Sequence, residues 1–179
     1  PDIPGSESLT DRLTTLLERE FSVTEGVDVS AVIGSKEGLA HLPMVFCNPG
    51  DVVLVPNPGY PVYRASAILA DATPVDVPLR RENGFVPDLE ELDASVLRRA
   101  RMIFLNYPNN PTGAVLTREQ MRRIVEVARR EDILVVSDNS YSHIRFDGQP
   151  PQSFLQVPGA TDICLELHSF SKTFNMTGW

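Results

Sequence analysis

A lysine near the end of the sequence stands where it could do chemistry. Lys172 lies in the stretch HSFSKTFNMTGW, among small hydroxyl residues and aromatics, just after the apolar run DICLEL. At a sheet edge and away from water, the amine of a lysine becomes available as a nucleophile toward carbonyls. Most lysines are solvated surface groups, however, so Lys172 by itself would indicate little.

A carboxylate and a phenol follow another apolar run. Asp138 ends the run DILVVSD, and Tyr141 comes three residues later. A carboxylate at the end of a buried strand is costly unless it has a cationic or hydrogen-bonding partner. A helix N-cap is the structural alternative for Asp138, because aspartate is common at that position.

The stretch NYPNNPTG contains two proline steps close together and presents amide side chains, notably that of Asn110. Proline restricts the residue before it and removes a donor, so the stretch predicts a stiff loop. Rigid loops at strand ends often carry functional sites. A purely structural turn remains the alternative.

Two further stretches could bind parts of a flat, phosphorylated ligand. Tyr60, in NPGYPVY, precedes a predicted helix and could stack on a planar ring, or could be a core aromatic. The turn that opens GSKEGLAHL presents backbone N–H groups at a helix start, around Ser35 and Lys36, which suits a phosphate. A Gly-Ser turn also serves geometry alone.

The elements that must position these residues alternate along the chain. Short apolar, β-branched runs without alternation predict strands buried on both faces, as in a parallel sheet. Segments of helical period separate them, which predicts a three-layer α/β/α sandwich with a mostly parallel sheet. The predicted strands are 28–34, 51–56, 73–79, 101–106, 132–138 and 162–168, and the predicted helices are 8–20, 36–46, 60–70, 88–99 and 117–130.

This topology places the candidate residues together. Ligands of open α/β sheets bind beyond the carboxyl ends of the strands. The amine, the carboxylate, the phenol, the amide, the aromatic ring and the phosphate-binding turn all follow predicted strands, so we expect them at one edge. Together they are what pyridoxal 5'-phosphate needs: a Schiff-base lysine, an acid for the pyridine nitrogen, donors to the ring oxygen and an anion site.

Composition limits the other possibilities. The chain has 179 residues, 42% of them apolar and 22% charged, which is ordinary for a soluble globular domain. Its formal net charge of −8 argues against nucleic acid or an anionic membrane as a partner. Cys47 and Cys164 lie in apolar contexts, so we expect buried thiols in a reducing, cytoplasmic compartment. The histidines show no metal-ligand spacing, and no run is long enough for a membrane helix.

The stretches quoted above, in their order, resemble fold-type I pyridoxal-phosphate aminotransferases of class I/II. The set NNPTG, then D..Y, then S.SK, carries the resemblance over nearly the whole chain. It implies a transaminase that moves an amino group between an amino acid and a 2-oxo acid. The stretches GSKEGLAHLP and SFSKTFNMTGW are most similar to those of the LL-diaminopimelate aminotransferase group and its near relatives.

The resemblance also implies a role for each site residue. Lys172 corresponds to the Schiff-base lysine and proton-transfer base, and Asp138 to the partner of the pyridinium nitrogen. Asn110 and Tyr141 correspond to the donors to the ring oxygen, and Tyr60 to the stacking aromatic. The phosphate ligands implied are Ser35, Lys36 and Ser169.

Family members are longer than this chain. They carry an N-terminal arm before such a segment, and after it a phosphate-binding arginine, a last strand and a small domain with a substrate-binding arginine. The resemblance therefore implies that residues 1–179 are the central part of the large pyridoxal-phosphate-binding domain. It also implies a homodimer for the full-length protein and little or no transaminase activity for this segment alone.

Two other functions share the same residues. A lyase or synthase that uses the same cofactor would keep Lys172 and Asp138 and differ in substrate-facing residues. A non-catalytic, aminotransferase-like effector domain of a transcriptional regulator would carry a helix-turn-helix ahead of this segment.

Overall fold

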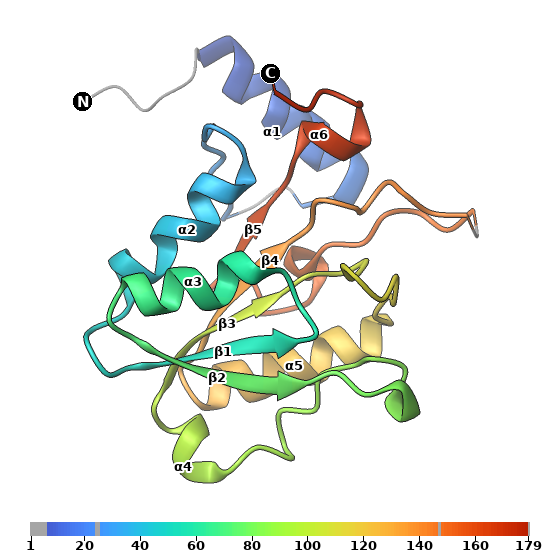
Figure 1. The fold of residues 1–179 in the computed structure, drawn as a ribbon. Coiled ribbons are helices and arrows are strands. Elements are labelled where there is room, and N and C mark those ends of the chain that lie inside the picture. Colours follow the sequence, from blue (N-terminus) through green and yellow to red (C-terminus); the bar gives the residue numbers. More distant parts are fainter. Residues whose placement is uncertain (1–6, 24–25, 147, 179) are drawn as a thin grey trace.

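The structure is a computed structural model that describes residues 7–23, 26–146 and 148–178. Helices and strands alternate along most of the chain (Figure 1). The α-helices are α1 (Glu7–Phe21), α2 (Ser35–Phe46), α3 (Pro61–Leu69), α4 (Ala94–Leu97), α5 (Arg118–Arg130) and α6 (Phe170–Thr173). The 3₁₀ helices are η1 (Arg81–Asn83) and η2 (Phe154–Gln156). The strands are β1 (Val52–Asn57), β2 (Thr73–Pro78), β3 (Ala100–Leu105), β4 (Leu134–Asp138) and β5 (Cys164–Leu167).

The five strands form one sheet in the order β2-β1-β3-β4-β5, and every neighbouring pair is parallel. Side chains of the central strands are buried on both faces, which is why these runs are continuously apolar rather than alternating. The expected parallel α/β sheet is therefore confirmed.

A hydrophobic core lies on each face of the sheet, between the strands and the helices that cover that face. The sheet and the helices on its two faces are the three layers. On one face, alternate strand residues such as Leu54 and Ile103 pack against α5 through Ile124. On the other face, Val53 and Phe104 belong to a core that contains residues of α2 and α3. Figure 1 shows α2 and α3 on the opposite side of the sheet from α5.

Helix α5 begins where its sequence pattern predicts. The Thr117 hydroxyl accepts a hydrogen bond of 3.2 Å from the Gln120 N–H, and the Gln120 side chain accepts one of 2.8 Å from the Thr117 N–H. This reciprocal capping box satisfies two N–H groups that the first turn of a helix leaves unpaired.

Two predicted elements are wrong. Residues 28–34 form no strand, because this segment pairs with neither edge of the sheet. Val29 faces a small cavity beside α1 and β5, and Ile33 is 89% exposed. The predicted helix 88–99 shrinks to α4, because the Asp93 side chain caps the chain only at that point, by accepting a hydrogen bond from the N–H of Ser95.

No helix in the described part of the chain combines the length and the apolar character that crossing a membrane requires.

Candidate functional site

The candidate residues follow the carboxyl ends of four parallel strands, as the topology predicts. Tyr60 follows β1, Asn110 follows β3, Asp138 ends β4, and Lys172 lies in α6, directly after β5. Asp138 is paired in register with Leu167, the last residue of β5. The sheet therefore brings Asp138 next to the strand end from which the chain leads to Lys172.

Asp138 is buried and hydrogen-bonded through both carboxylate oxygens. It is only 5% exposed, its Oδ2 accepts a hydrogen bond of 2.7 Å from the Tyr63 hydroxyl, and its Oδ1 accepts one of 2.6 Å from the Ser140 hydroxyl. These donors are the partners that a buried carboxylate requires. Asp138 does not cap a helix, because the residues after it, 140–143, form turns.

Tyr63 is a residue that the sequence patterns did not single out. Its side chain is fully buried, and its ring stacks on that of Phe104 with 4.9 Å between centroids. Burial, and then the negative charge of Asp138, raise the pKa of the Tyr63 hydroxyl far above its ordinary value, so it remains a donor. A signal was present: Tyr63 lies three residues after Tyr60 in the predicted helix 60–70, a spacing that would put both on one face of that helix.

Tyr60 joins this buried pair to the start of α2. Its ring meets Tyr63 edge-on at 5.7 Å, and Nζ of Lys36 lies 5.7 Å from the centroid of the Tyr60 ring. A hydrogen bond with the Tyr60 hydroxyl raises the pKa of the Lys36 amine. Tyr60 is half-buried, so it packs against the core on one side and leaves part of its ring accessible.

Asn110 and Tyr141 contact each other. Burial raises the pKa of the Tyr141 hydroxyl, the charge of Asp138 adds to this effect, and a hydrogen bond with Asn110 partly offsets it. The loop and the strand end thus present an amide and a phenol as a pair close to the buried carboxylate.

Asn106, a second residue that the sequence patterns did not single out, holds the loop in place. Its Nδ2 donates a hydrogen bond of 2.7 Å to the main-chain oxygen of Asp138, and its Oδ1 accepts one of 2.7 Å from the Asn110 N–H. Within the loop, Oδ1 of Asn109 accepts a hydrogen bond of 2.7 Å from the Thr112 hydroxyl. The asparagine side chains thus join the loop to the end of β4 and to itself through hydrogen bonds.

The first turn of α2 has the geometry of an anion site. Gly34 precedes the helix with φ +74°, a conformation that favours glycine, and offers no side chain to cap it. The N–H groups of Ser35 and Lys36 therefore stand at the positive end of the helix dipole. Gly38 lets the helix approach β5 closely, because a Cβ there would lie 2.5 Å from the side chain of Leu167.

Ser169 and Lys172 lie at the same strand edge. The Ser169 hydroxyl accepts a hydrogen bond of 3.2 Å from the Ser171 N–H and so caps the short helix α6. Lys172 is exposed, and within the described ranges no hydrogen bond or ion pair joins it to Asp138 or Tyr141. The same part of the chain holds no group of three His, Cys, Asp or Glu residues that could bind a metal ion.

The sequence of this chain matches a known protein family and several named proteins. The family model "Aminotransferase class I and II" matches residues 1–179. The LL-diaminopimelate aminotransferase of Desulforudis audaxviator is 57% identical over 152 residues, which cover 85% of this chain and 39% of that protein. The enzyme of the same name from Aquifex aeolicus is 46% identical over 181 residues, covering 100% of this chain and 47% of the relative.

Solved structures agree with the sequence relatives. Substrate-bound BacF from Bacillus subtilis superposes with a TM-score of 0.95 at 41% identity, over 100% of this chain and 46% of that one. An aminotransferase from Staphylococcus aureus superposes with a TM-score of 0.92 at 33% identity, over 99% of this chain and 47% of that one. The chain thus spans about half the length of the relatives that it matches, and it belongs to the family of class I and II aminotransferases.

Proposed function

We propose that the complete gene product is a pyridoxal-phosphate-dependent aminotransferase, which moves an amino group between an amino acid and a 2-oxo acid. Residues 1–179 would form the central part of its large cofactor-binding domain. The observation that carries the proposal is the buried carboxylate of Asp138, which lies at the same sheet edge as the amine-bearing helix α6. Membership of the family supports the same function.

The bonding of Asp138 fits a pyridine nitrogen. A carboxylate has about four lone-pair positions, and the two donors from Tyr63 and Ser140 use one at each oxygen. A further N–H donor can therefore bind without displacing either partner. Asp138 would hold a proton on the ring nitrogen, because a buried anion stabilises a nearby cation strongly.

The other contacts fit the rest of the cofactor. Tyr60 would cover the ring, and the pair formed by Asn110 and Tyr141 would donate hydrogen bonds to the ring oxygen. The phosphate would bind at the uncapped start of α2, to the N–H groups of Ser35 and Lys36. Ser169 would contribute its hydroxyl from the neighbouring strand end.

Lys172 would supply the chemistry that the rest of the site supports. Its amine would hold the aldehyde carbon of the cofactor and, once a substrate amine has replaced it, would move a proton at the substrate α-carbon. When bound, the cofactor supplies an electron sink for the charge that develops at that carbon. The carboxylate of Asp138 would stabilise the protonated ring throughout.

The substrate class is proposed from the relatives. Two of them are named LL-diaminopimelate aminotransferases, and on that basis we propose LL-diaminopimelate as the amino donor. Amino-acid and 2-oxo-acid substrates, a homodimeric assembly and a cytoplasmic location belong to the same proposal. Formation of glutamate from LL-diaminopimelate and the matching 2-oxo acid separates this activity from a lyase that uses the same cofactor.

The decisive experiment locates the covalent bond to the cofactor. Lys36 and Lys172 are the two lysines of the sequence, so each serves as a control for the other. The complete gene product is loaded with pyridoxal phosphate, reduced with borohydride and digested for mass spectrometry. We expect the label on Lys172, its absence in Lys172→Ala and its retention in Lys36→Ala. Label on Lys36 or on any lysine outside residues 1–179, or no label in the wild-type protein, would overturn the proposal.

A further inference from the structure

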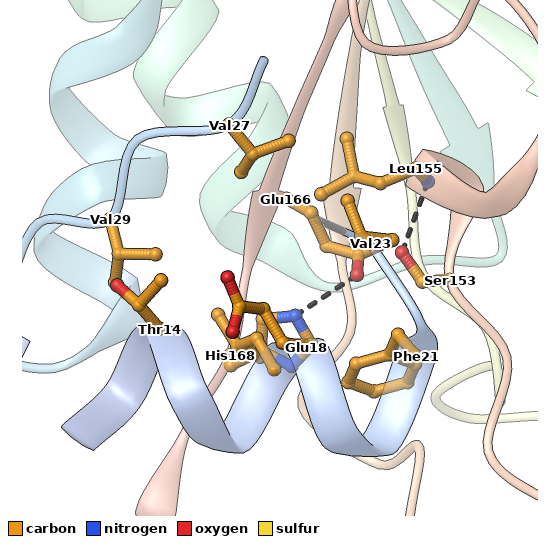
Figure 2. Close-up of a pocket in the computed structure, with 11 residues that line it drawn as sticks. Thr14, Glu18, Phe21, Val23, Val27, Val29, Ser153, Leu155, Glu166 and His168 are labelled. Atoms are coloured by element: carbon orange, nitrogen blue, oxygen red, sulfur yellow. Dashed lines mark hydrogen bonds and ion pairs between the residues drawn. The ribbon is translucent and has the colours of Figure 1, made fainter. Parts of the chain in front are cut away.

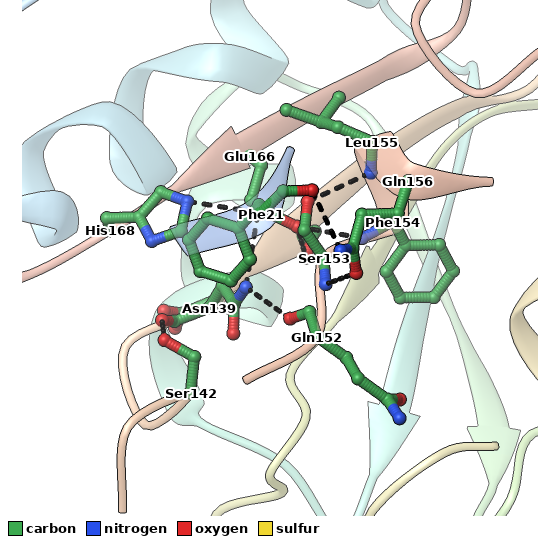
Figure 3. Close-up of polar contacts among 12 residues, drawn as sticks. Phe21, Asn139, Ser142, Gln152, Ser153, Phe154, Leu155, Gln156, Glu166 and His168 are labelled. Carbon is green, nitrogen blue, oxygen red and sulfur yellow. Dashed lines mark hydrogen bonds and ion pairs between the residues drawn. The ribbon is translucent and has the colours of Figure 1, made fainter. Parts of the chain in front are cut away.

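A second buried carboxylate lies one strand away from Asp138. The Glu166 side chain, on β5, is 1% exposed and accepts hydrogen bonds from groups that come from separate segments of the chain (Figure 3). We call this set the Glu166 cluster. Its donors are the Ser137 hydroxyl at 3.0 Å, the Asn139 side-chain amide at 3.1 Å, the Phe154 N–H at 3.1 Å and Nε2 of His168 at 3.0 Å.

The two carboxylates differ in how many positions their partners leave open. Each oxygen of Glu166 accepts two of these hydrogen bonds, whereas each oxygen of Asp138 accepts one. A carboxylate with its four lone-pair positions in use has no place for a ligand. The carboxylate of Glu166 therefore holds protein groups together. The carboxylate of Asp138 can still accept hydrogen bonds from a ligand.

The charge of Glu166 is stabilised in place. Burial by itself raises the pKa of this carboxyl, but the hydrogen bond and charge of His168, together with the other hydrogen bonds such as that of the Asn139 amide, outweigh burial and hold the pKa below its ordinary value. Glu166 is thus an anion near neutral pH, and its donors are held by charge-assisted hydrogen bonds, which are the stronger kind.

The cluster also reaches the end of α1. The His168 ring packs against that of Phe21 with 5.2 Å between centroids, and the side-chain amide of Gln156 donates a hydrogen bond of 2.8 Å to the Phe21 carbonyl. Figure 2 shows Glu166, His168 and Phe21 around a small cavity between α1 and β5. Helix α1, 3₁₀ helix η2 and the two strand ends therefore share one polar centre.

The members of the cluster are the chain neighbours of the proposed site. Asn139 directly follows Asp138, and His168 directly precedes Ser169 and lies four residues before Lys172. A main-chain hydrogen bond also joins the ends of β4 and β5: the Asn139 N–H donates to the Leu167 carbonyl at 2.8 Å. Any movement of β5 against β4 at this point would change the distance between the two functional groups.

We propose that Glu166 is a positioning residue: through Asn139 and His168 it sets how the exit of β5, which carries Lys172, lies relative to Asp138. This inference rests on the proposed function. Because the cluster faces away from the cofactor side of β4, it would act without touching the cofactor. The register supports this placement, since Ser137 pairs with Glu166 while Asp138 pairs with Leu167.

Glu166→Gln is the informative substitution, because it keeps the shape and removes two acceptor positions. The new side-chain NH₂ would face an N–H donor, either that of Phe154 or the amide of Asn139, and two donors cannot pair. Val125→Ala is the matched control. It opens a small hole in α5, in the core that also contains Phe154, and lowers stability without removing any of the hydrogen bonds to Glu166.

The experiment compares the variants in the complete gene product. Cofactor dissociation constants and the pH midpoint of the visible absorbance of the bound cofactor are measured, alongside the unfolding temperature of each protein. In Glu166→Gln we expect the dissociation constant to rise by about tenfold and the midpoint to be displaced. In Val125→Ala both should stay at the wild-type value despite a lower unfolding temperature.

The outcomes separate this inference from the proposed function. A wild-type protein that forms no covalent bond with the cofactor would refute the proposed function itself. A wild-type protein that does so, with Glu166→Gln behaving like Val125→Ala, would overturn the positioning role alone. Should Glu166→Gln fail to fold, Ser137→Ala removes a single donor to Glu166 and decides instead: a midpoint displaced from wild type supports the role, and an unchanged one contradicts it.

Discussion

The Tyr63 hydroxyl donates a hydrogen bond of 2.7 Å to Oδ2 of Asp138, although 75 residues separate the two in the sequence. The bond joins helix α3 to the end of strand β4. It is fully buried, and the stacking of Tyr63 on Phe104 holds the donor in place. The carboxylate at the centre of the proposed site is thus oriented by a residue that would not itself touch the cofactor.

Replacing Tyr63 by phenylalanine should destabilise the protein measurably. Tyr63→Phe keeps the stacked ring and removes a donor to a buried anion, a loss of about 2 kcal/mol in the free energy of unfolding. Urea titration of the cofactor-free protein measures it. The control is Tyr107→Phe, which removes a hydrogen bond of 2.7 Å to the Phe85 carbonyl, a neutral acceptor, and should cost about 1 kcal/mol. Equal losses in the two variants would show that the charge of Asp138 adds nothing.

Stability should fall at acidic pH partly because of Glu166. The folded protein lowers the pKa of this carboxyl below the value of about 4.3 that glutamate has in an unfolded chain. The unfolded state therefore binds more protons between the two values, so the stabilisation is complete above about pH 4.3 and is lost as the pH falls through the folded-state pKa. In Glu166→Gln, the curve of unfolding free energy against pH should be flatter in that range.

Glu119 provides the control for this pH dependence. Hydrogen bonds from Arg122 and then Arg123 lower its pKa to about 2, but the three side chains lie on the exposed face of α5. Solvent screens such surface pairs, so their contribution to stability is small. Glu119→Gln should leave the acid limb of the curve close to wild type, and a flattening as large as that of Glu166→Gln would contradict the assignment.

The thiol of Cys47 should react slowly. Burial, and then the nearby charge of Asp51, raise its pKa from the usual 9.0 to about 11. At pH 8 the thiolate, which is the reactive form, is then about a hundredfold rarer than in an unperturbed cysteine. Alkylation by iodoacetamide, followed by mass spectrometry, measures the rate. Cys164, whose pKa burial also raises, should react slowly as well, and both should react rapidly in urea. Native Cys47 reacting at the rate of free cysteine would refute this prediction.

The capping box of α5 should contribute to stability. Thr117→Ala removes the side-chain acceptor for the Gln120 N–H, and we expect a loss of about 1 kcal/mol in the free energy of unfolding. Thr15→Ala is the control, because its exposed hydroxyl only bonds back to the Asp11 carbonyl within α1. Chemical denaturation should give Thr117→Ala a clearly lower free energy of unfolding than Thr15→Ala. The reverse order would contradict the capping role.

Several elements could be predicted because the residues that determine them lie within short stretches of the sequence. The Thr117 and Gln120 pair marks the start of α5, and the apolar runs around Val53 and Ile103 mark strands that are covered on both faces. Segment 28–34 has a similar composition but pairs with neither edge strand of the sheet, and its Val29 faces a cavity lined by residues of α1 and β5 instead. A strand needs a neighbour, and composition does not reveal whether one is free.

The sequence by itself determined the layered α/β architecture and the row of groups that follow the strands, from Tyr60 to Lys172, because periodicity and capping act locally and the ends of parallel strands meet at one edge of a sheet. Only the tertiary structure decided which donors surround each buried carboxylate. Tyr63 reaches Asp138 from another helix, and Phe154 and Ser137 reach Glu166 from separate segments. Those partners meet because packing removes water from both anions, which must then find hydrogen bonds within the protein, and no local pattern encodes which distant group supplies them.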